Sequence, residues 1–213
     1  MYTPPAFRED DPAALRQIMR EARLATLVTA TSEGLVATPL PLYLDESEGE
    51  PGTLYGHLAR ANRQWALEPA GEALVVFAGP DAYVSPSWYA SKREHGKVVP
   101  TWNYVAVHAY GRAEFFDDPA RLREAVTRLT ELYEEPRAEP WAVSDAPDRF
   151  VEAQLRGIVG VRVTLARIEG KRKMSQNRPQ ADRDGVAAGL AGSGRDSDRA
   201  VASMVSTPPR RRF

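Results

Sequence analysis

The sequence contains no cysteine, which excludes disulfide bonds and thiolate metal sites and agrees with a reducing compartment. It also contains no apolar run close to the length of about 18 residues that a membrane span requires. The first ten residues, MYTPPAFRED, lack the basic and apolar segments of a secretory signal. We therefore expect a cytoplasmic protein that does not enter a membrane.

Net charge and histidine are also scarce. The 28 Lys and Arg residues nearly balance the 29 Asp and Glu residues, so the net charge is −1 and no global field favours nucleic acid or an anionic membrane. The three histidines, His57, His95 and His108, have no second histidine or carboxylate at metal-ligand spacing, so we predict no metal site. P-loop, Rossmann, nucleophile-elbow and helix-turn-helix patterns are missing too.

What the sequence does contain is a series of strand patterns. Apolar and β-branched residues predict strands at 24–31, 35–44, 53–58, 73–78, 104–116 and 158–169. Helices are expected from Asp11-Pro12, at 61–67, after Asp118-Pro119 and at 148–156. Because strands dominate without regular strand–helix alternation, the pattern favours a mainly β (α+β) fold, an antiparallel barrel with peripheral helices. Pro39 and Pro41, which lack N–H donors, predict an edge strand or a bulge at 35–44.

The most informative stretch is 79–112, GPDAYVSPSWYASKREHGKVVPTWNYVAVHAYGR. Its aromatic residues alternate with Ser, Asn, His and Pro, which is unlike an ordinary core run. Flat side chains interleaved with hydrogen-bonding ones suit a pocket for a flat ligand with polar edges. The alternative is a long, partly buried loop that its own rings hold in place.

Two further clusters combine basic and polar residues. In GHLARANRQW, a strand ends at His57, and a short turn then supplies Arg60, Asn62 and Arg63. Such a turn can bind a phosphate, or it can be a solvated turn whose arginines pair with nearby carboxylates. The segment EGKRKMSQNRPQADR, 169–183, can hold one small anion or can be a surface turn before a helix.

Taken together, these motifs resemble the PaiB-type FMN-binding negative transcriptional regulators. The resemblance is carried by MYTPPAF, GHLARANRQW, GPDAYVSPSWY, VPTWNYVAVHAYG, GIVGVRV and KMSQNRPQADR, which lie between residue 1 and about residue 183. It implies an antiparallel split β-barrel of the pyridoxamine-phosphate-oxidase type, FMN as cofactor, and a homodimer with FMN near the subunit interface.

The resemblance also implies roles for single residues. Ala37 and Thr38 would lie along the isoalloxazine ring, and His57, Arg60 and Asn62 would serve the phosphate and ribityl end. Trp102 and Asn103 would wall the pocket, and the remaining cofactor-binding residues would be Lys173, Ser175, Gln176 and Arg178. The chain departs from the family pattern at Pro39, where a histidine is common, and at Arg63, where a proline is common. Both departures weaken the expectation of tight FMN binding.

The resemblance covers residues 1–183, which we expect to form an FMN-binding domain, and the composition beyond them predicts a helical extension at 184–205 and a disordered tail at 206–213. Two functions stay open, and a third option is a barrel that has lost FMN and serves only as an interaction module. The first is a repressor or flavin-linked regulator that acts through DNA or a regulatory protein partner. The alternative is a flavin-dependent oxidoreductase of a small molecule that uses NAD(P)H, with the flavin carrying the electron chemistry and the catalytic residues unknown.

Overall fold

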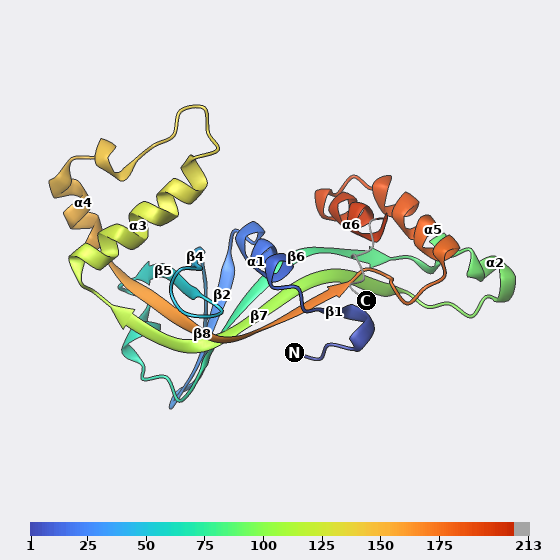
Figure 1. Ribbon diagram of the computed structural model, residues 1–213, viewed down its shortest axis with the longest axis horizontal. Helices are drawn as coiled ribbons and strands as arrows, with labels where there is room; N and C mark the ends of the chain where they lie inside the picture. Colours follow the sequence, from blue (N-terminus) through green and yellow to red (C-terminus); the bar gives the residue numbers. More distant parts are fainter. Residues whose placement is uncertain (207–213) are drawn as a thin grey trace. The chain divides into compact units, whose positions relative to one another are not determined.

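A single antiparallel sheet forms the centre of the fold, as the sequence predicts. A computed structural model describes residues 1–206 of the 213-residue chain. Within these residues eight strands form one sheet (Figure 1). In chain order they are β1 (Arg8–Glu9), β2 (Ala25–Thr31), β3 (Gly34–Leu40), β4 (Leu42–Asp45), β5 (Thr53–Ala59), β6 (Ala73–Val84), β7 (Thr101–Phe116) and β8 (Ile158–Lys173).

The strands are ordered β3-β2-β6-β7-β8-β5-β4 across the sheet, and β1 pairs with β8. The strands predicted at 24–31 and 35–44 form a hairpin, because β2 and β3 pair antiparallel with Thr26 opposite Pro39. Since β3 stands at one end of this order, Pro39 lies on an edge strand, as its missing N–H predicts. Pro41 separates β3 from β4.

The described chain also contains ten helices. The α-helices are α1 (Pro12–Glu21), α2 (Ser91–His95), α3 (Pro119–Glu134), α4 (Asp148–Leu155), α5 (Gln180–Ala191) and α6 (Asp196–Ser206), and the 3-10 helices are η1 (Pro5–Phe7), η2 (Arg63–Ala66), η3 (Pro86–Trp88) and η4 (Val143–Asp145). Asp118 caps α3 as predicted, because its Oδ1 accepts a 2.9 Å hydrogen bond from the N–H of Arg121. In residues 1–206 no helix is long and apolar enough to cross a membrane.

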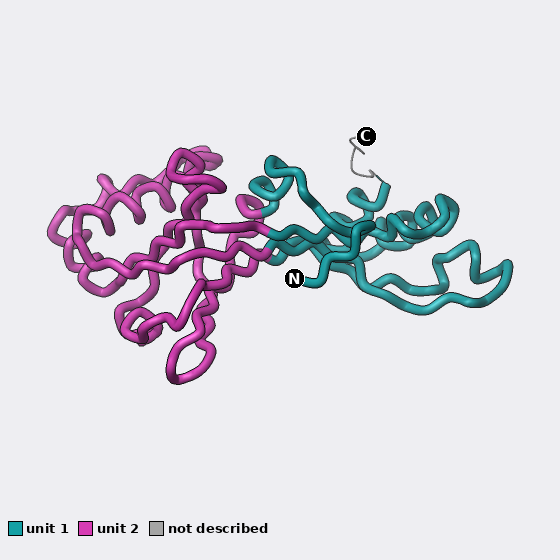
Figure 2. Tube along the Cα trace, turned by 60° about the horizontal axis from the view of Figure 1, so that its bottom comes forward, with its two compact units in different colours: residues 1–18, 78–107, 169–213 teal, residues 19–77, 108–168 magenta. Residues whose placement is uncertain are grey.

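The chain divides into two compact units, coloured separately in Figure 2. Unit 1 comprises 1–18, 78–107 and the described residues from 169 onward. Unit 2 comprises 19–77 and 108–168. Strands β6, β7 and β8 contribute residues to both units, so each unit is assembled from separate pieces of the chain.

Each unit has its own apolar core. In unit 2, α3 and α4 lie side by side (Figure 1) around a buried cluster of Phe116, Leu122, Ala125, Val143, Val151 and Leu155. In unit 1, α5 and α6 pack against each other, and their buried residues include Val186, Leu190, Val201 and Val205. The two helices of each pair are thus supported by side chains that are removed from water.

Three strands are longer than their local patterns predict. β7 begins at Thr101 rather than at residue 104, and β6, predicted to end at residue 78, continues to Val84, with Ala82 and Val84 buried. β8 similarly continues through basic residues to Lys173. Ser206, the first residue of the predicted tail, is the last residue of α6, and the rest of that tail, 207–213, lies outside the described residues.

Candidate functional site

The GHLARANRQW motif forms the turn between β5 and η2 in unit 2. Asn62 caps η2, because its Oδ1 accepts a 3.1 Å hydrogen bond from the N–H of Gln64. Its amide also donates to Oγ1 of Thr38 on β3, at 2.7 Å. The structure therefore brings together the predicted site residues Thr38 and Asn62, and the exposed Ala37 precedes Thr38 on the edge strand.

Gln64 belongs to the same motif, but sequence reasoning did not select it. Its side chain is 1% exposed, and its Nε2 donates to Oγ1 of Thr29 at 3.0 Å and to the carbonyl of Val36 at 3.2 Å. Its Oε1 is buried with no hydrogen-bond partner among residues 1–206. A buried acceptor of this kind is rare and marks a position where a bound molecule can donate.

His57 carries a second buried polar atom without a partner. It lies on β5, and its Nδ1 finds no hydrogen-bond partner in the described part of the chain. Burial lowers the pKa of its imidazole below the ordinary value of 6.5, so the ring is neutral at pH 7. A neutral imidazole can donate or accept at this nitrogen, depending on its tautomer.

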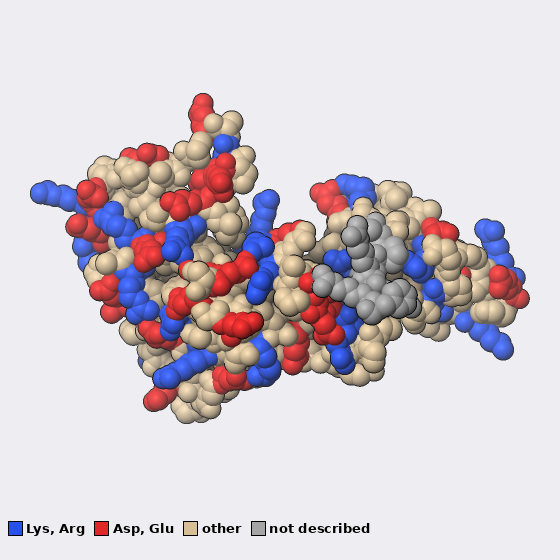
Figure 3. All heavy atoms as spheres, in the orientation of Figure 1, with Lys and Arg blue, Asp and Glu red and all other residues tan. Residues whose placement is uncertain are grey.

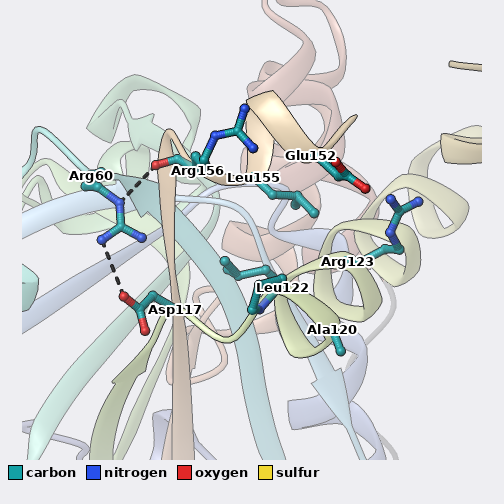
Figure 4. Close-up of a pocket in the computed structure, with 9 residues that line it drawn as sticks. Arg60, Asp117, Ala120, Leu122, Arg123, Glu152, Leu155 and Arg156 are labelled. Atoms are coloured by element: carbon teal, nitrogen blue, oxygen red, sulfur yellow. Dashed lines mark hydrogen bonds and ion pairs between the residues drawn. The ribbon is translucent and has the colours of Figure 1, made fainter. Parts of the chain in front are cut away.

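Arg60 is held by protein groups at the edge of a pocket of about 590 Å³ (Figure 4). Its Nε donates to the carbonyl of Arg156 at 2.9 Å, and its Nη2 donates to the carbonyl of Ile158 at 3.2 Å. Its Nη1 lies 3.5 Å from a carboxylate oxygen of Asp117. These contacts agree with the second reading of the motif, in which its arginines pair with nearby protein groups. A guanidinium has five N–H donors, so Arg60 still has donors for an anion.

The pocket beside Arg60 combines an apolar floor with a charged rim. The buried Leu122 of α3 and Leu155 of α4 project into it (Figure 4). The charged residues that line it are Arg60, Asp117, Arg123, Glu152 and Arg156. Of the predicted site residues, which all lie within 1–206, Arg60 alone lines this pocket. The pocket is thus suited to an anion with an apolar body.

In unit 1, Asn103 and Ser175 form a buried pair although they are 72 positions apart. Asn103 is 0% exposed and Ser175 is 3% exposed, and the Asn103 amide donates to Oγ of Ser175 at 3.0 Å. Ser175 has a φ of 60°, in the left-handed region that residues other than glycine rarely adopt. Backbone strain of this kind clusters at functional sites. The neighbouring Trp102 is half exposed, and its ring meets that of Tyr83 edge-on at 6.0 Å between centroids.

Lys173 and Gln176 flank this serine. The Nζ of Lys173 donates to Oγ1 of Thr101 at 2.5 Å, and burial lowers the pKa of its ammonium group. Gln176 stabilises its own turn, because its side chain accepts from the N–H of Met174 at 2.6 Å and donates to the carbonyl of Arg172. Lys173 and Gln176 thus both use side-chain hydrogen-bonding groups within unit 1.

The predicted residues fall into two groups, one in each unit. Unit 2 holds Ala37, Thr38, His57, Arg60 and Asn62, and unit 1 holds Trp102, Asn103, Lys173, Ser175, Gln176 and Arg178. Both groups offer hydrogen-bond donors and a cation, which FMN needs for its phosphate, ribityl hydroxyls and ring carbonyls. Unit 2 also holds the buried Oε1 of Gln64, an acceptor without a hydrogen-bond partner among the described residues. No cluster of three metal-binding side chains occurs between residues 1 and 206.

Comparison with known proteins decides the family. Residues 1–167 match the sequence model of a family described as "Putative FMN-binding domain". The chain belongs to this FMN-binding family. A Bacillus subtilis relative, "Protease synthase and sporulation protein PAI 2", is 36% identical over 183 residues, or 85% of each chain. An uncharacterized Emericella nidulans protein is 35% identical over 242 residues, or 96% of each chain. These matches confirm the PaiB-type resemblance and FMN as the cofactor.

The fold is shared beyond the family. The solved structure of an FAD and heme binding protein from Mycobacterium smegmatis aligns with a TM-score of 0.56 and 16% sequence identity. The alignment covers 85% of this chain and 80% of that one. At this identity the likeness concerns the fold alone, and it confirms the predicted antiparallel split β-barrel for this FMN-binding family member.

Proposed function

We propose that this protein is a flavin-linked negative regulator of the PaiB type. The observation that carries the proposal is the match of residues 1–167 to an FMN-binding family together with the 36% identity to the Bacillus subtilis protein named "Protease synthase and sporulation protein PAI 2". In this proposal the protein is a cytoplasmic homodimer with FMN near the subunit interface. The bound flavin supplies redox chemistry, and the protein binds it, orients it and excludes water from it.

Each group of residues has its own part in the proposal. In unit 2, the Ala37–Thr38 backbone lies along the ring, and His57, Arg60 and Asn62 bind the ribityl and phosphate end. The cap that joins Asn62 to Thr38 supports this assignment, because it holds two of these residues in one place before a ligand arrives.

In unit 1, Trp102 and Asn103 form a wall of the pocket, and Lys173, Ser175, Gln176 and Arg178 complete it. The strained Ser175 and the partly buried Lys173 support this part of the proposal. A bound anion would give the Lys173 ammonium group a counter-charge.

Regulation through a protein partner is favoured over direct DNA binding. Figure 3 shows Lys and Arg interspersed with Asp and Glu over the visible face, rather than gathered into a single basic surface. With a net charge of −1, the chain lacks the electrostatic attraction that supplies most non-specific DNA affinity. A salt-dependent, sequence-specific shift of promoter DNA by the purified protein would instead support direct binding.

The second candidate is a flavin-dependent oxidoreductase that uses NAD(P)H. The observation that favours it is Lys173, whose ammonium group donates a hydrogen bond to the Thr101 hydroxyl. Because the pKa of this ammonium group is lowered, Lys173 can hold or release a proton beside a ligand. Turnover of NAD(P)H by the flavin-loaded protein would favour this function over regulation alone.

The visible absorption spectrum tests the binding site directly. Purified protein is mixed with FMN, excess flavin is removed by gel filtration, and the retained flavin is measured per protein chain. We expect stoichiometric retention by the wild type, and weaker retention by Arg60→Ala and Arg178→Ala. Arg149→Ala changes an exposed arginine outside both groups and serves as the control. No retention by the wild type would refute the proposed function, and unchanged retention by both variants would refute the residue assignment.

A further inference from the structure

Helix α5 approaches the segment around Trp88 so closely that only glycine fits at two of its positions. A Cβ atom at Gly185 would lie 2.0 Å from the carbonyl oxygen of Trp88, and a Cβ at Gly189 would lie 2.4 Å from the indole ring. Glycine inside a helix costs about 1 kcal/mol relative to alanine. The two glycines lie four residues apart on the face of α5 that meets Trp88. They make the helix less stable by itself, and they allow it to pack closely against Trp88.

Asp182 ties the same helix to the residue that begins α2. Its side chain is 1% exposed, although aspartate is rarely buried. Oδ1 accepts a 2.9 Å hydrogen bond from the N–H of Ser91, and Oδ2 accepts a 2.7 Å bond from its hydroxyl. Burial by itself would raise the pKa of Asp182, but the bonds from Ser91 and the charge of Arg178 outweigh it and lower that pKa. Asp182 is therefore a paired carboxylate at pH 7.

Arg178 adds a third contact just before α5. Its guanidinium lies over the ring of Tyr89 at 4.8 Å, and Tyr89 is 2% exposed. Three residues of one short segment, Trp88, Tyr89 and Ser91, thus contact residues 178–189. The segment belongs to the aromatic stretch of the sequence, and the residues that hold it follow the region that matches the FMN-binding family, which ends at residue 167.

The helix that makes these contacts is itself well supported. Val186 and Leu190 of α5 are each 0% exposed, and they belong to the hairpin in which α5 packs against α6 (Figure 1). Arg183 extends the connection, because its Nη2 donates to the carbonyl of Val205 at 3.0 Å. The α5–α6 hairpin therefore offers a rigid base rather than a loose extension.

We propose that the α5–α6 hairpin is a positioning element of the FMN site, and that Asp182, Gly185 and Gly189 set the place of the segment Trp88–Ser91. The inference rests on the proposed FMN site in unit 1, to which Arg178 belongs. The hairpin touches the aromatic segment rather than the flavin, so its contribution reaches FMN through Tyr89 and Arg178. Residues beyond the matched domain are then required for full flavin affinity.

Alanine substitution of helix glycines provides a matched test. Gly185→Ala and Gly189→Ala add a Cβ where Trp88 leaves no space, whereas Gly192→Ala adds one at the end of the same helix, where the nearest atom is 3.8 Å away. FMN affinity is measured by quenching of flavin fluorescence. We expect the first two variants to bind FMN at least about tenfold more weakly than wild type and Gly192→Ala to match wild type.

Substitution of Asp182 tests the polar contact with a milder change. Asp182→Ala removes both acceptors for Ser91, while Asp182→Asn keeps one, so we expect FMN affinity to fall in the order wild type, Asn, Ala. Asp184→Ala, which changes an exposed aspartate on the same helix, serves as the control. Visible circular dichroism at saturating FMN, well below the unfolding temperature, should change for Asp182→Ala, because it reports the ring's surroundings rather than overall stability.

The outcomes separate this inference from the function on which it rests. If wild type binds FMN and the Gly185, Gly189 and Asp182 variants bind it with unchanged affinity and dichroism, the positioning role is wrong while the FMN site stands. If wild type retains no FMN, the proposed function fails and this inference fails with it. Should Gly185→Ala not fold, the Asp182 variants decide: the FMN affinity of Asp182→Asn must lie below that of wild type and above that of Asp182→Ala, and equal affinities would overturn the inference.

Discussion

Asn62 donates a 2.7 Å hydrogen bond from its amide to the hydroxyl of Thr38. The same side chain accepts from the N–H of Gln64, so it caps η2 and joins the turn after β5 to the edge strand β3. A single residue therefore connects two segments that the sequence separates by 24 positions. The geometry of the predicted phosphate turn depends on this connection.

Replacement of Asn62 should separate its two contributions. Asn62→Ala loses the cap and the bond to Thr38, and we expect the free energy of unfolding to fall by about 1–2 kcal/mol. Asn62→Ser keeps a capping oxygen but is too short to reach Thr38, so its loss should be about half as large. Urea denaturation followed by tryptophan fluorescence measures both. Equal losses in the two variants would contradict a contribution from the cap.

His57 should make stability depend on pH. Because burial lowers its pKa, the folded protein resists protonation, whereas the unfolded chain takes up a proton near the ordinary pKa of 6.5. The free energy of unfolding therefore falls as the pH drops below about 6.5. His57→Gln should flatten this dependence between about pH 7.5 and 5.5, while His95→Gln, which changes an exposed histidine, should preserve it. Parallel curves for wild type and His57→Gln would rule out this role.

Arg162 should stabilise unit 2 through a cluster of charged and polar groups. Its Nε donates to Glu48 at 2.9 Å and to the Tyr55 hydroxyl at 3.1 Å, and its Nη1 donates to Glu114 at 3.2 Å. Arg162→Met leaves both carboxylates without this cation, and we expect a loss of about 1–2 kcal/mol because the cluster is only partly shielded from water. Arg149→Met is the exposed control. Chemical denaturation at low and high salt should show the difference shrinking as salt increases, and a salt-independent loss would argue for packing instead.

Gly111 should tolerate no side chain, because β7 and β8 approach closely there. A Cβ at Gly111 would lie 2.0 Å from the carbonyl oxygen of Thr164. We expect Gly111→Ala to destabilise the protein by about 1–3 kcal/mol, since backbone must move to accept the methyl group. Gly71→Ala, where no atom lies within 4 Å, should leave the thermal unfolding temperature nearly unchanged. Similar unfolding temperatures for the two variants would contradict the close approach.

Much of the fold could be predicted because strand patterns are local. Val159, Val161 and Val163 alternate with more polar residues, and all three are 0–1% exposed. The lengths of the strands could not be predicted in the same way. β6 continues past residue 78, where the predicted strand ends, because pairing with a neighbouring strand satisfies its backbone groups regardless of local preference.

The candidate site was predictable in its motifs and less so in its contacts. The motif GHLARANRQW drew attention to Asn62 and Arg60, but nothing in it distinguishes Gln64 as the buried residue with an open acceptor. That property depends on β2 and β3, because the Gln64 amide nitrogen donates to Oγ1 of Thr29 on β2 and to the carbonyl of Val36 on β3. Asp182 escaped notice for a similar reason, because its partner lies far away in the chain.

The sequence by itself was enough to predict the family, the β-sheet fold class and the cofactor, because motifs and the alternation of apolar and polar residues lie within short stretches of the chain. Three-dimensional folding decided which polar groups meet. Asp182 accepts a hydrogen bond from Ser91, which is 91 positions away in the chain. Arg60 donates hydrogen bonds to the carbonyls of Arg156 and Ile158. Such pairs come together only when paired strands and packed helices bring distant segments within hydrogen-bond distance, and short-range sequence patterns do not encode that distance.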